Sequence, residues 1–208
     1  WLVMAAGLYF TFSYAGWLAV LVGLGVFWWL TFPSWKLIVG GVAGTALAIL
    51  SQWQSPKFQQ FLDLAGRSSS HVRLQVWQTA LLMIKEHWLT GIGLGLFEKR
   101  YLEFAERLFR PPLEPIMLHA HNFWLQSWLN LGLLGLIGFV AWLGKWFWEL
   151  WPLVKGMRLP VVAIFAAMVS LLVHGLVDTP YWKNDLAALF WMIMALGVLF
   201  IRKYERQN

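Results

Sequence analysis

The sequence predicts an all-α protein: a polytopic bundle of transmembrane helices with an external loop region that contains amphipathic helices. Composition is the first observation behind this prediction, because 60% of the 208 residues are apolar and only 12% are charged, against roughly 25% in soluble domains. The second is the placement of the charges, since residues 1–35 carry none and residues 54–117 carry 14. The third is the length of the uncharged blocks, which approaches that of a helix crossing a bilayer.

These uncharged blocks mark the expected spans, because a helix needs ~20 apolar residues to cross the hydrocarbon core. They cover residues 1–32, 37–53, 123–144, 159–177 and 186–201. The first block is too long for one helix, and its small and hydroxyl residues at 11–16 predict a break there. We therefore expect residues 1–12 to end a truncated helix and residues 16–32 to form the next, which gives about five full spans.

We therefore expect one domain with three parts: transmembrane helices over 1–53, an external loop over 54–117 and transmembrane helices over 118–208. The short loops and the tail carry Lys and Arg, as cytoplasmic segments of membrane proteins do. The loop at 54–117 and the turn at 178–185 then lie together on the periplasmic or external face. Because the chain starts with a tryptophan inside an apolar run, we expect it to be the C-terminal part of a longer protein.

The external loop contains two predicted amphipathic helices. Ser68–Ser70 precede apolar residues spaced by three and four positions up to Ile84, the pattern of a helix with a serine cap. The glycine-rich stretch 91–95 interrupts the pattern, residues 97–109 continue it, and prolines from Pro111 onward end it. Helices of this kind lie on a membrane surface or cap a bundle.

Several partners and kinds of chemistry are not expected. The net charge of +6 is explained by basic membrane-protein loops, so no nucleic acid is expected. The sequence contains no cysteine, which excludes disulfides and thiol catalysis. It has no His-Glu-x-x-His motif, and His119 and His121 would diverge by ~200° on one helix. We therefore expect no metal and no cofactor, and the lipid bilayer as a partner.

His121 is the strongest candidate for a catalytic residue. It lies at the outer mouth of a predicted span, and histidine is well suited to take a proton near neutral pH. Asn122 could orient it or hold a sugar hydroxyl, and Gln126 lies one helical turn further on the same face. Spacing alone leaves open an interfacial histidine beside a small-residue packing stripe at Gly132 and Gly135.

The remaining candidates are charged or ionisable residues near the external face. Arg73, close to the start of the first amphipathic helix, could bind a phosphate with both arms of its guanidinium; a snorkelling or solvated arginine is the alternative. Arg67 is a weaker candidate of the same kind. His174 lies near an apolar block, where an ionisable group often has a function, and Asp178 follows it at the end of the same span, where polar residues are otherwise ordinary.

At this point the motifs resemble a known family, the O-antigen ligase and O-antigen polymerase superfamily. The resemblance is carried by Arg73-Leu74-Gln75-Val76-Trp77, Gly91-Ile92-Gly93-Leu94-Gly95-Leu96-Phe97, Tyr101, and His121-Asn122 followed after nine residues by Gly132-Leu133-Leu134-Gly135. The string His174–Asp178 with Lys183-Asn184-Asp185-Leu186 resembles the end of that domain. The similarity covers nearly all of the chain.

The resemblance implies a multi-pass glycosyltransferase of the bacterial inner (plasma) membrane, active on the periplasmic face in lipopolysaccharide or cell-envelope polysaccharide biosynthesis. It would transfer or polymerise a glycan from an undecaprenyl-pyrophosphate donor onto a sugar hydroxyl of a glycan or lipid-linked acceptor. By the same resemblance His121 would deprotonate the acceptor, and Arg73 would hold the pyrophosphate in place of a metal. The remaining substrate-binding candidates are Asn122, Gln126, Arg67, His174 and Asp178.

The sequence departs from the family pattern at Tyr14, where members often carry an arginine after a serine. Either Arg67 takes that role or pyrophosphate binding is weaker. Two other functions stay open: a transporter-like relative of the superfamily, and a non-catalytic membrane scaffold. A transporter is expected to place polar groups at mid-membrane, whereas these spans are bare of charge; a scaffold would tolerate substitution of His121 and Arg73.

Overall fold

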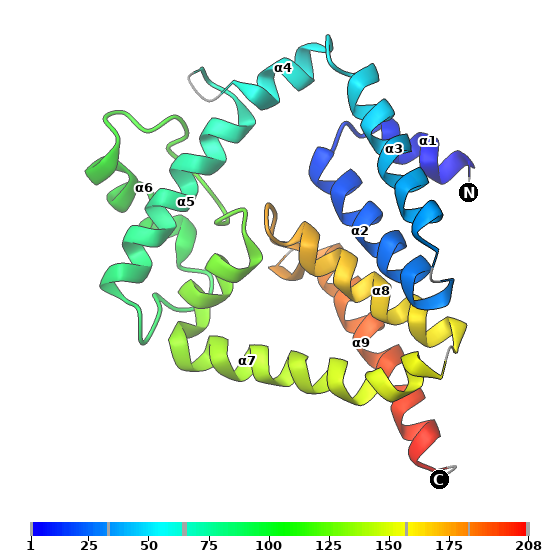
Figure 1. Cartoon of the computed structure of the whole chain (residues 1–208). Coiled ribbons are helices and arrows are strands. Elements are labelled where there is room, and N and C mark those ends of the chain that lie inside the picture. Colours follow the sequence, from blue (N-terminus) through cyan, green and yellow to red (C-terminus); the bar gives the residue numbers. More distant parts are fainter. Residues whose placement is uncertain (1, 33, 64–65, 157, 183, 207–208) are drawn as a thin grey trace. The chain divides into compact units, whose positions relative to one another are not determined.

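The computed structural model describes residues 2–32, 34–63, 66–156, 158–182 and 184–206, and these residues form helices and turns with no strand (Figure 1). The prediction of an all-α protein is confirmed. The chain divides into two compact units. Unit 1 takes residues 1–52, 142–174 and 180–208, and unit 2 takes residues 53–141 and 175–179. Pro33 and Lys183, the latter part of the family string, lie outside the described residues.

The predicted break inside the first uncharged block is confirmed. Helix α1 (Leu2–Phe10) ends there and α2 (Tyr14–Thr31) begins, two residues earlier than expected. The hydroxyl of Ser13 accepts a bond from the Gly16 amide at 3.2 Å, which satisfies one of the free donors at a helix start. The chain then continues into α3 (Trp35–Ser51).

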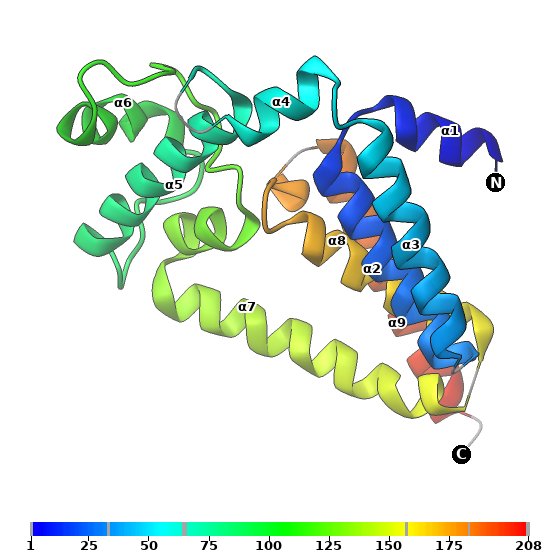
Figure 2. The same ribbon diagram turned by 45° about the horizontal axis from the view of Figure 1, so that its top comes forward.

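Helices α2 and α8 (Leu159–His174) lie side by side in unit 1, as both views show (Figures 1 and 2). Small residues allow this approach: a Cβ on Gly23 would lie only 2.8 Å from the Cβ of Ser170. The Ser170 hydroxyl donates to the Ala19 carbonyl at 2.8 Å. Close contact through small residues and interhelical hydrogen bonds is typical of helix packing in membranes. The 3₁₀ turn η1 (Pro180–Trp182) and α9 (Asn184–Glu205) complete unit 1.

Within the part of the chain that the structure describes, three helices are long and apolar enough to cross a membrane: Tyr14–Thr31, Phe123–Lys155 and Leu186–Glu205. The stretches Val39–Ser51 and Leu159–His174 are shorter apolar helices. Helix α7 (Phe123–Lys155) extends beyond the uncharged block that predicted it. Its continuation carries Lys145 and Glu149, whose charged atoms lie 3.5 Å apart one turn from each other, so these charges do not end the helix.

Unit 2 contains the predicted amphipathic helices, α5 (Ser69–Glu86) and α6 (Phe97–Leu108). The expected serine cap is present, since the Ser68 hydroxyl accepts from the His71 amide at 3.1 Å. The apolar faces of the two helices form the core of the unit, which contains Val76, Ala80, Met83, Ile84, Phe97, Tyr101, Phe104 and Ala105. Helix α4 (Pro56–Leu62) was not predicted from the sequence.

Helix α7 is interrupted at Gly132, whose φ of 68° is outside the helical range. The break meets the glycine-rich turn after α5. A Cβ on Gly91 would lie 2.8 Å from the Gly132 nitrogen, and a Cβ on Gly132 would lie 2.6 Å from the Thr90 carbonyl carbon. The Ile92 amide donates to the Leu129 carbonyl at 2.7 Å. Gly132 therefore serves a backbone-to-backbone contact here, rather than the helix-packing stripe considered from spacing.

Candidate active site

His121 lies just before α7, with an unusual backbone conformation. Its φ is 46°, in the left-handed region that few non-glycine residues adopt, although histidine does so more often than most. Its carbonyl accepts a bond from the Trp77 indole N–H at 3.1 Å. Trp77 belongs to α5, so this bond ties the middle of that helix to the residue in front of α7.

Asn122 caps α7. Its side-chain oxygen accepts from the amides of Trp124 at 2.9 Å and Leu125 at 3.0 Å, and its NH₂ group donates to the Leu176 carbonyl at 2.8 Å. The Phe123 amide donates to the Gly175 carbonyl at 2.7 Å. Asn122 therefore joins α7 to segment 175–179. Both the oxygen and the NH₂ group of its side chain are hydrogen-bonded within the protein.

Gln126 lies in the interior of unit 2, with 2% of its surface exposed. Its side-chain oxygen accepts from the Ala120 amide at 2.8 Å, and its NH₂ group donates to Asn130 at 3.1 Å. The predicted substrate-binding residue thus holds the backbone immediately before His121. A buried amide with good partners is costly to disturb, so its contribution to a site is through this support.

Asp178 faces the imidazole of His121, a pairing that sequence reasoning did not predict. The Asp178 Oδ1 atom lies 3.6 Å from His121 Nδ1, just beyond hydrogen-bond range, and accepts from the Thr179 amide at 2.8 Å. Both side chains are partly exposed, at 30% for His121 and 19% for Asp178. With Nδ1 turned to a carboxylate, Nε2 is the ring nitrogen open to a second partner, the arrangement of a histidine base with an orienting acid.

Arg73 lies one turn before Trp77 on the same face of α5. Its Nη1 is 3.5 Å from the Ser69 carbonyl, and its Nε is buried. The Arg73 Nε, the Ser70 hydroxyl and the Thr179 hydroxyl are buried atoms without a hydrogen-bond partner in the described part of the chain. Such groups are rare in folded proteins, and a bound ligand is one explanation for them. All three residues belong to unit 2.

The other predicted residues have different surroundings. Arg67 is 68% exposed and pairs with Glu114 at 2.8 Å, so its charge is engaged at the surface of unit 2. His174 ends α8 and is half-buried in unit 1. Tyr14, in the place of the family arginine, is the first residue of α2 and packs edge-on against Trp17 in unit 1, with ring centroids 5.4 Å apart. The structure thus brings together His121, Asn122 and Asp178.

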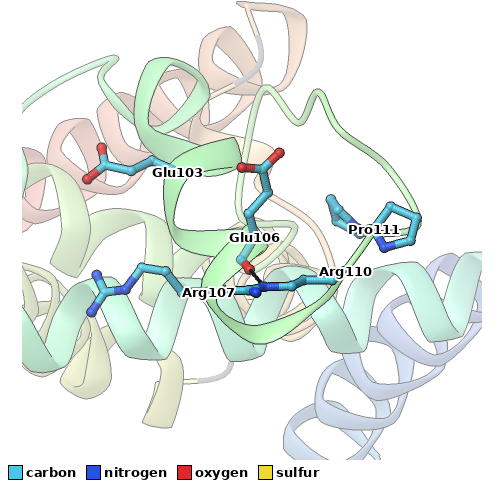
Figure 3. Close-up of a pocket in the computed structure, with 6 residues that line it drawn as sticks. Glu103, Glu106, Arg107, Arg110 and Pro111 are labelled. Atoms are coloured by element: carbon cyan, nitrogen blue, oxygen red, sulfur yellow. Dashed lines mark hydrogen bonds between the residues drawn. The ribbon is translucent and has the colours of Figure 1, made fainter.

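A hollow of about 420 Å³ lies at the end of α6, lined by Glu103, Glu106, Arg107, Arg110, Pro111 and Pro112 (Figure 3). Arg107 is paired with Glu86 of α5, and this hydrogen bond raises the pKa of Arg107 and lowers that of Glu86. Arg110 donates to the Glu106 carbonyl at 3.4 Å. The lining therefore carries both acidic and basic side chains, and its Arg107 is paired with Glu86. None of the candidate residues lines this hollow.

Tyr101 marks the core side of α6. Only 1% of its surface is exposed, and burial raises the pKa of its phenol, with a smaller contribution from the charge of Glu114. It is therefore a neutral packing residue. In the described segments no group of three or more His, Cys, Asp or Glu side chains is placed to hold a metal ion.

Comparison with known proteins identifies the family to which the chain is similar. A family model described as O-antigen ligase matches residues 1–140, which include Arg73 and His121. The chain is 30% identical over 144 residues to the O-antigen ligase of Salmonella typhimurium, covering 62% of this chain and 34% of that protein. It is 29% identical over 143 residues to an uncharacterized protein of Haemophilus influenzae, covering 60% and 35% respectively. The matched part is therefore about a third of each of these relatives.

Proposed function

The chain belongs to the O-antigen ligase family, and from this premise we propose that it carries the catalytic part of a membrane glycosyltransferase. The donor is a glycan on undecaprenyl pyrophosphate, and the acceptor is a sugar hydroxyl. The observation that carries the proposal is His121, whose Nδ1 faces Asp178 at 3.6 Å and whose backbone is bonded to the helix that bears Arg73. The family and the apolar helices make the protein a multi-pass bacterial membrane protein; we place it in the inner membrane with this site on the periplasmic face.

The reaction is a nucleophilic substitution at the anomeric carbon of the donor. The acceptor oxygen forms the new glycosidic bond while the bond from the anomeric carbon to the pyrophosphate oxygen breaks. His121 Nε2 takes the proton of the acceptor hydroxyl, as a general base does. The carboxylate of Asp178 lies 3.6 Å from Nδ1 on the other side of the ring, where it orients the imidazole and faces the positive charge that the ring gains in this step.

Arg73 stabilises the leaving group. Negative charge builds up on the pyrophosphate as the bond breaks, and a fixed guanidinium beside it lowers the barrier. A planar guanidinium can meet two phosphate oxygens at once. In this proposal the arginine supplies the positive charge that a divalent metal supplies in many other transferases, so turnover continues in the presence of a chelator.

The test uses the full-length protein in cells that lack the gene. His121→Ala and His121→Asn are compared with the native protein for membrane accumulation and for transfer of surface glycan. The asparagine variant tolerates the left-handed backbone and removes only the base. Both are expected to accumulate normally and to lose about 10²–10⁴-fold in transfer rate. Near-normal transfer by either variant contradicts the proposal and favours a scaffold.

The surface glycans of the same cells distinguish a ligase from a polymerase. Loss of glycan attachment with chain length preserved identifies a ligase, whereas attachment of single repeat units identifies a loss of polymerisation. A second measurement tests the role of a metal: transfer is assayed after chelation and again after magnesium is added back. A complete loss of transfer on chelation that magnesium restores would assign the leaving-group charge to a metal instead of Arg73.

A further inference from the structure

We propose that Trp77 is a positioning residue for His121. Its indole N–H donates to the His121 carbonyl at 3.1 Å and holds the backbone in the conformation that turns the imidazole toward Asp178. The inference rests on the proposed role of His121 as the base. It adds a residue that acts on the reaction through His121 and needs no contact with the substrate.

The backbone of His121 needs such support. A residue with a φ of 46° is held against its own preference, and it persists only when the surrounding structure fixes it. The neighbouring peptide groups are fixed from α7 and segment 175–179: the Ala120 amide donates to Gln126 at 2.8 Å, and the Phe123 amide donates to Gly175 at 2.7 Å. The bond to the carbonyl of His121 itself comes from Trp77.

The geometry makes the histidine the adjustable partner of the pair. Asp178 is held by the Thr179 amide at 2.8 Å. The 3.6 Å between its carboxylate and His121 Nδ1 is just too long for a hydrogen bond, so a small change in the backbone from which the His121 side chain extends closes or opens the contact. The bond to the carbonyl oxygen restrains that backbone.

Trp77 also connects the two proposed functional groups. Arg73 lies one turn before it on the same face of α5. The helix that presents the cation to the leaving group therefore also fixes the base that activates the acceptor. This arrangement keeps the base and the leaving-group ligand in register, which matters because a misplacement of about 1 Å can cost roughly 100-fold in rate.

The test is Trp77→Phe in the full-length protein, with Trp128→Phe as the matched control. Trp128 also lies in unit 2, and its indole N–H donates to the Trp88 carbonyl at 2.8 Å, so the same atoms are lost away from His121. W77F is expected to lower kcat roughly 10–100-fold with the donor KM within about twofold of native. W128F is expected to keep kcat within about twofold.

The double variant decides whether Trp77 acts through the histidine pair. If it does, adding W77F to Asp178→Asn costs less than about threefold, because the contact it positions is already lost. The inference is overturned if the losses of kcat from W77F and Asp178→Asn multiply in the double variant. It is also overturned if W77F loses no more kcat than W128F, or if it accumulates in the membrane less well than W128F. His121→Ala is measured alongside: full activity there refutes the proposed base, whereas an inactive H121A beside a normal W77F refutes only the role of Trp77.

Discussion

Unit 1 and unit 2 bury different kinds of side chain. The buried polar residues of the described chain are Gln52 in unit 1 and Ser68, Gln75, Thr79, Gln126, Ser127, Asn130 and Thr179 in unit 2. In unit 1 apolar helices satisfy their own backbone groups, as segments in a bilayer must. In unit 2 side chains hold the ends of helices and the turns between them, for example Asn122 before α7 and Gln75 at the Leu113 amide.

This difference explains where the candidate chemistry lies. A base and an anion-binding arginine need fixed positions and hydrogen-bonding partners, and a buried polar framework provides both. Unit 1 buries fewer polar side chains, and its close helix packing suits anchoring in a membrane. The two units are therefore expected to respond differently to substitution: unit 2 through loss of turnover or of the fold, and unit 1 through graded loss of stability.

The largest effect is expected at Gly132. Gly132→Ala forces a side chain into the left-handed region and places its Cβ 2.6 Å from the Thr90 carbonyl carbon. The variant is expected to lose several kcal/mol of stability and to fail to accumulate in the membrane, as measured by quantitative blotting. Gly138→Ala, in the same helix with open space around it, should accumulate normally; equal levels of the two variants would contradict the backbone contact.

Substitution of Arg73 is expected to remove turnover without removing the fold. Arg73→Ala should lower kcat about 10²–10³-fold, the range seen when one stabilising donor is lost. Arg73→Lys should lie between the native protein and the alanine variant, because it keeps the charge and loses the planar fork. Initial rates of transfer are compared with those of Arg100→Ala on α6, which should stay near native; the reverse order would relocate the anion site.

A smaller effect is expected in unit 1. Gly23→Ala places a Cβ 2.8 Å from the Cβ of Ser170, and overpacking of this kind costs about 1–3 kcal/mol. Gly25→Ala is the control, since it lies in the same helix with nothing within 4 Å. Thermal unfolding in detergent should show a lower Tm for Gly23→Ala only, with transfer unchanged at low temperature. A loss of turnover greater than the loss of folded protein would mean that unit 1 shapes the chemistry.

The smallest effect is expected at the surface pair Glu86–Arg107 of unit 2. Because the hydrogen bond from Arg107 lowers the pKa of Glu86 from its ordinary value, the contribution of the pair is present at neutral pH and is lost as the pH falls through that lowered pKa. Glu86→Gln should therefore lower the Tm slightly at neutral pH, and the difference from native should shrink on acidification. A difference that grows on acidification would assign the effect to something other than this pair.

Local signals were enough to predict much of the fold. The break near Ser13, the serine cap at Ser68 and the proline-limited end of α6 each depend on residues within a few positions, and each is confirmed. Helix α4 carried the same kind of signal, a serine followed by a proline at its start, and was missed because it is short. The end of α7 was predicted wrongly because a charge was read as a boundary although Lys145 pairs along the helix.

The candidate site depended on contacts that no local pattern contains. His121 and Arg73 were singled out from their local sequence, and the family resemblance implied their roles, but the bond between Trp77 and His121 joins residues 44 positions apart. The pairing with Asp178 requires segment 175–179 to return to the start of α7, which the Asn122 and Phe123 bonds accomplish. Gln126 was predicted to bind substrate because the sequence places it on the same helix face as Asn122. Its burial in the core depends on tertiary packing, which the sequence pattern does not contain.

The contact between Gly91 and Gly132 has a consequence for how this protein can change over generations. The atoms nearest to a side chain at either position are main-chain atoms of residues 89, 90, 128, 129 and 132. Every amino acid has the same main chain, so no replacement elsewhere can open space for a side chain at either glycine. A screen for second-site suppressors of Gly132→Ala should therefore return true revertants, and glycine is expected to persist at both positions.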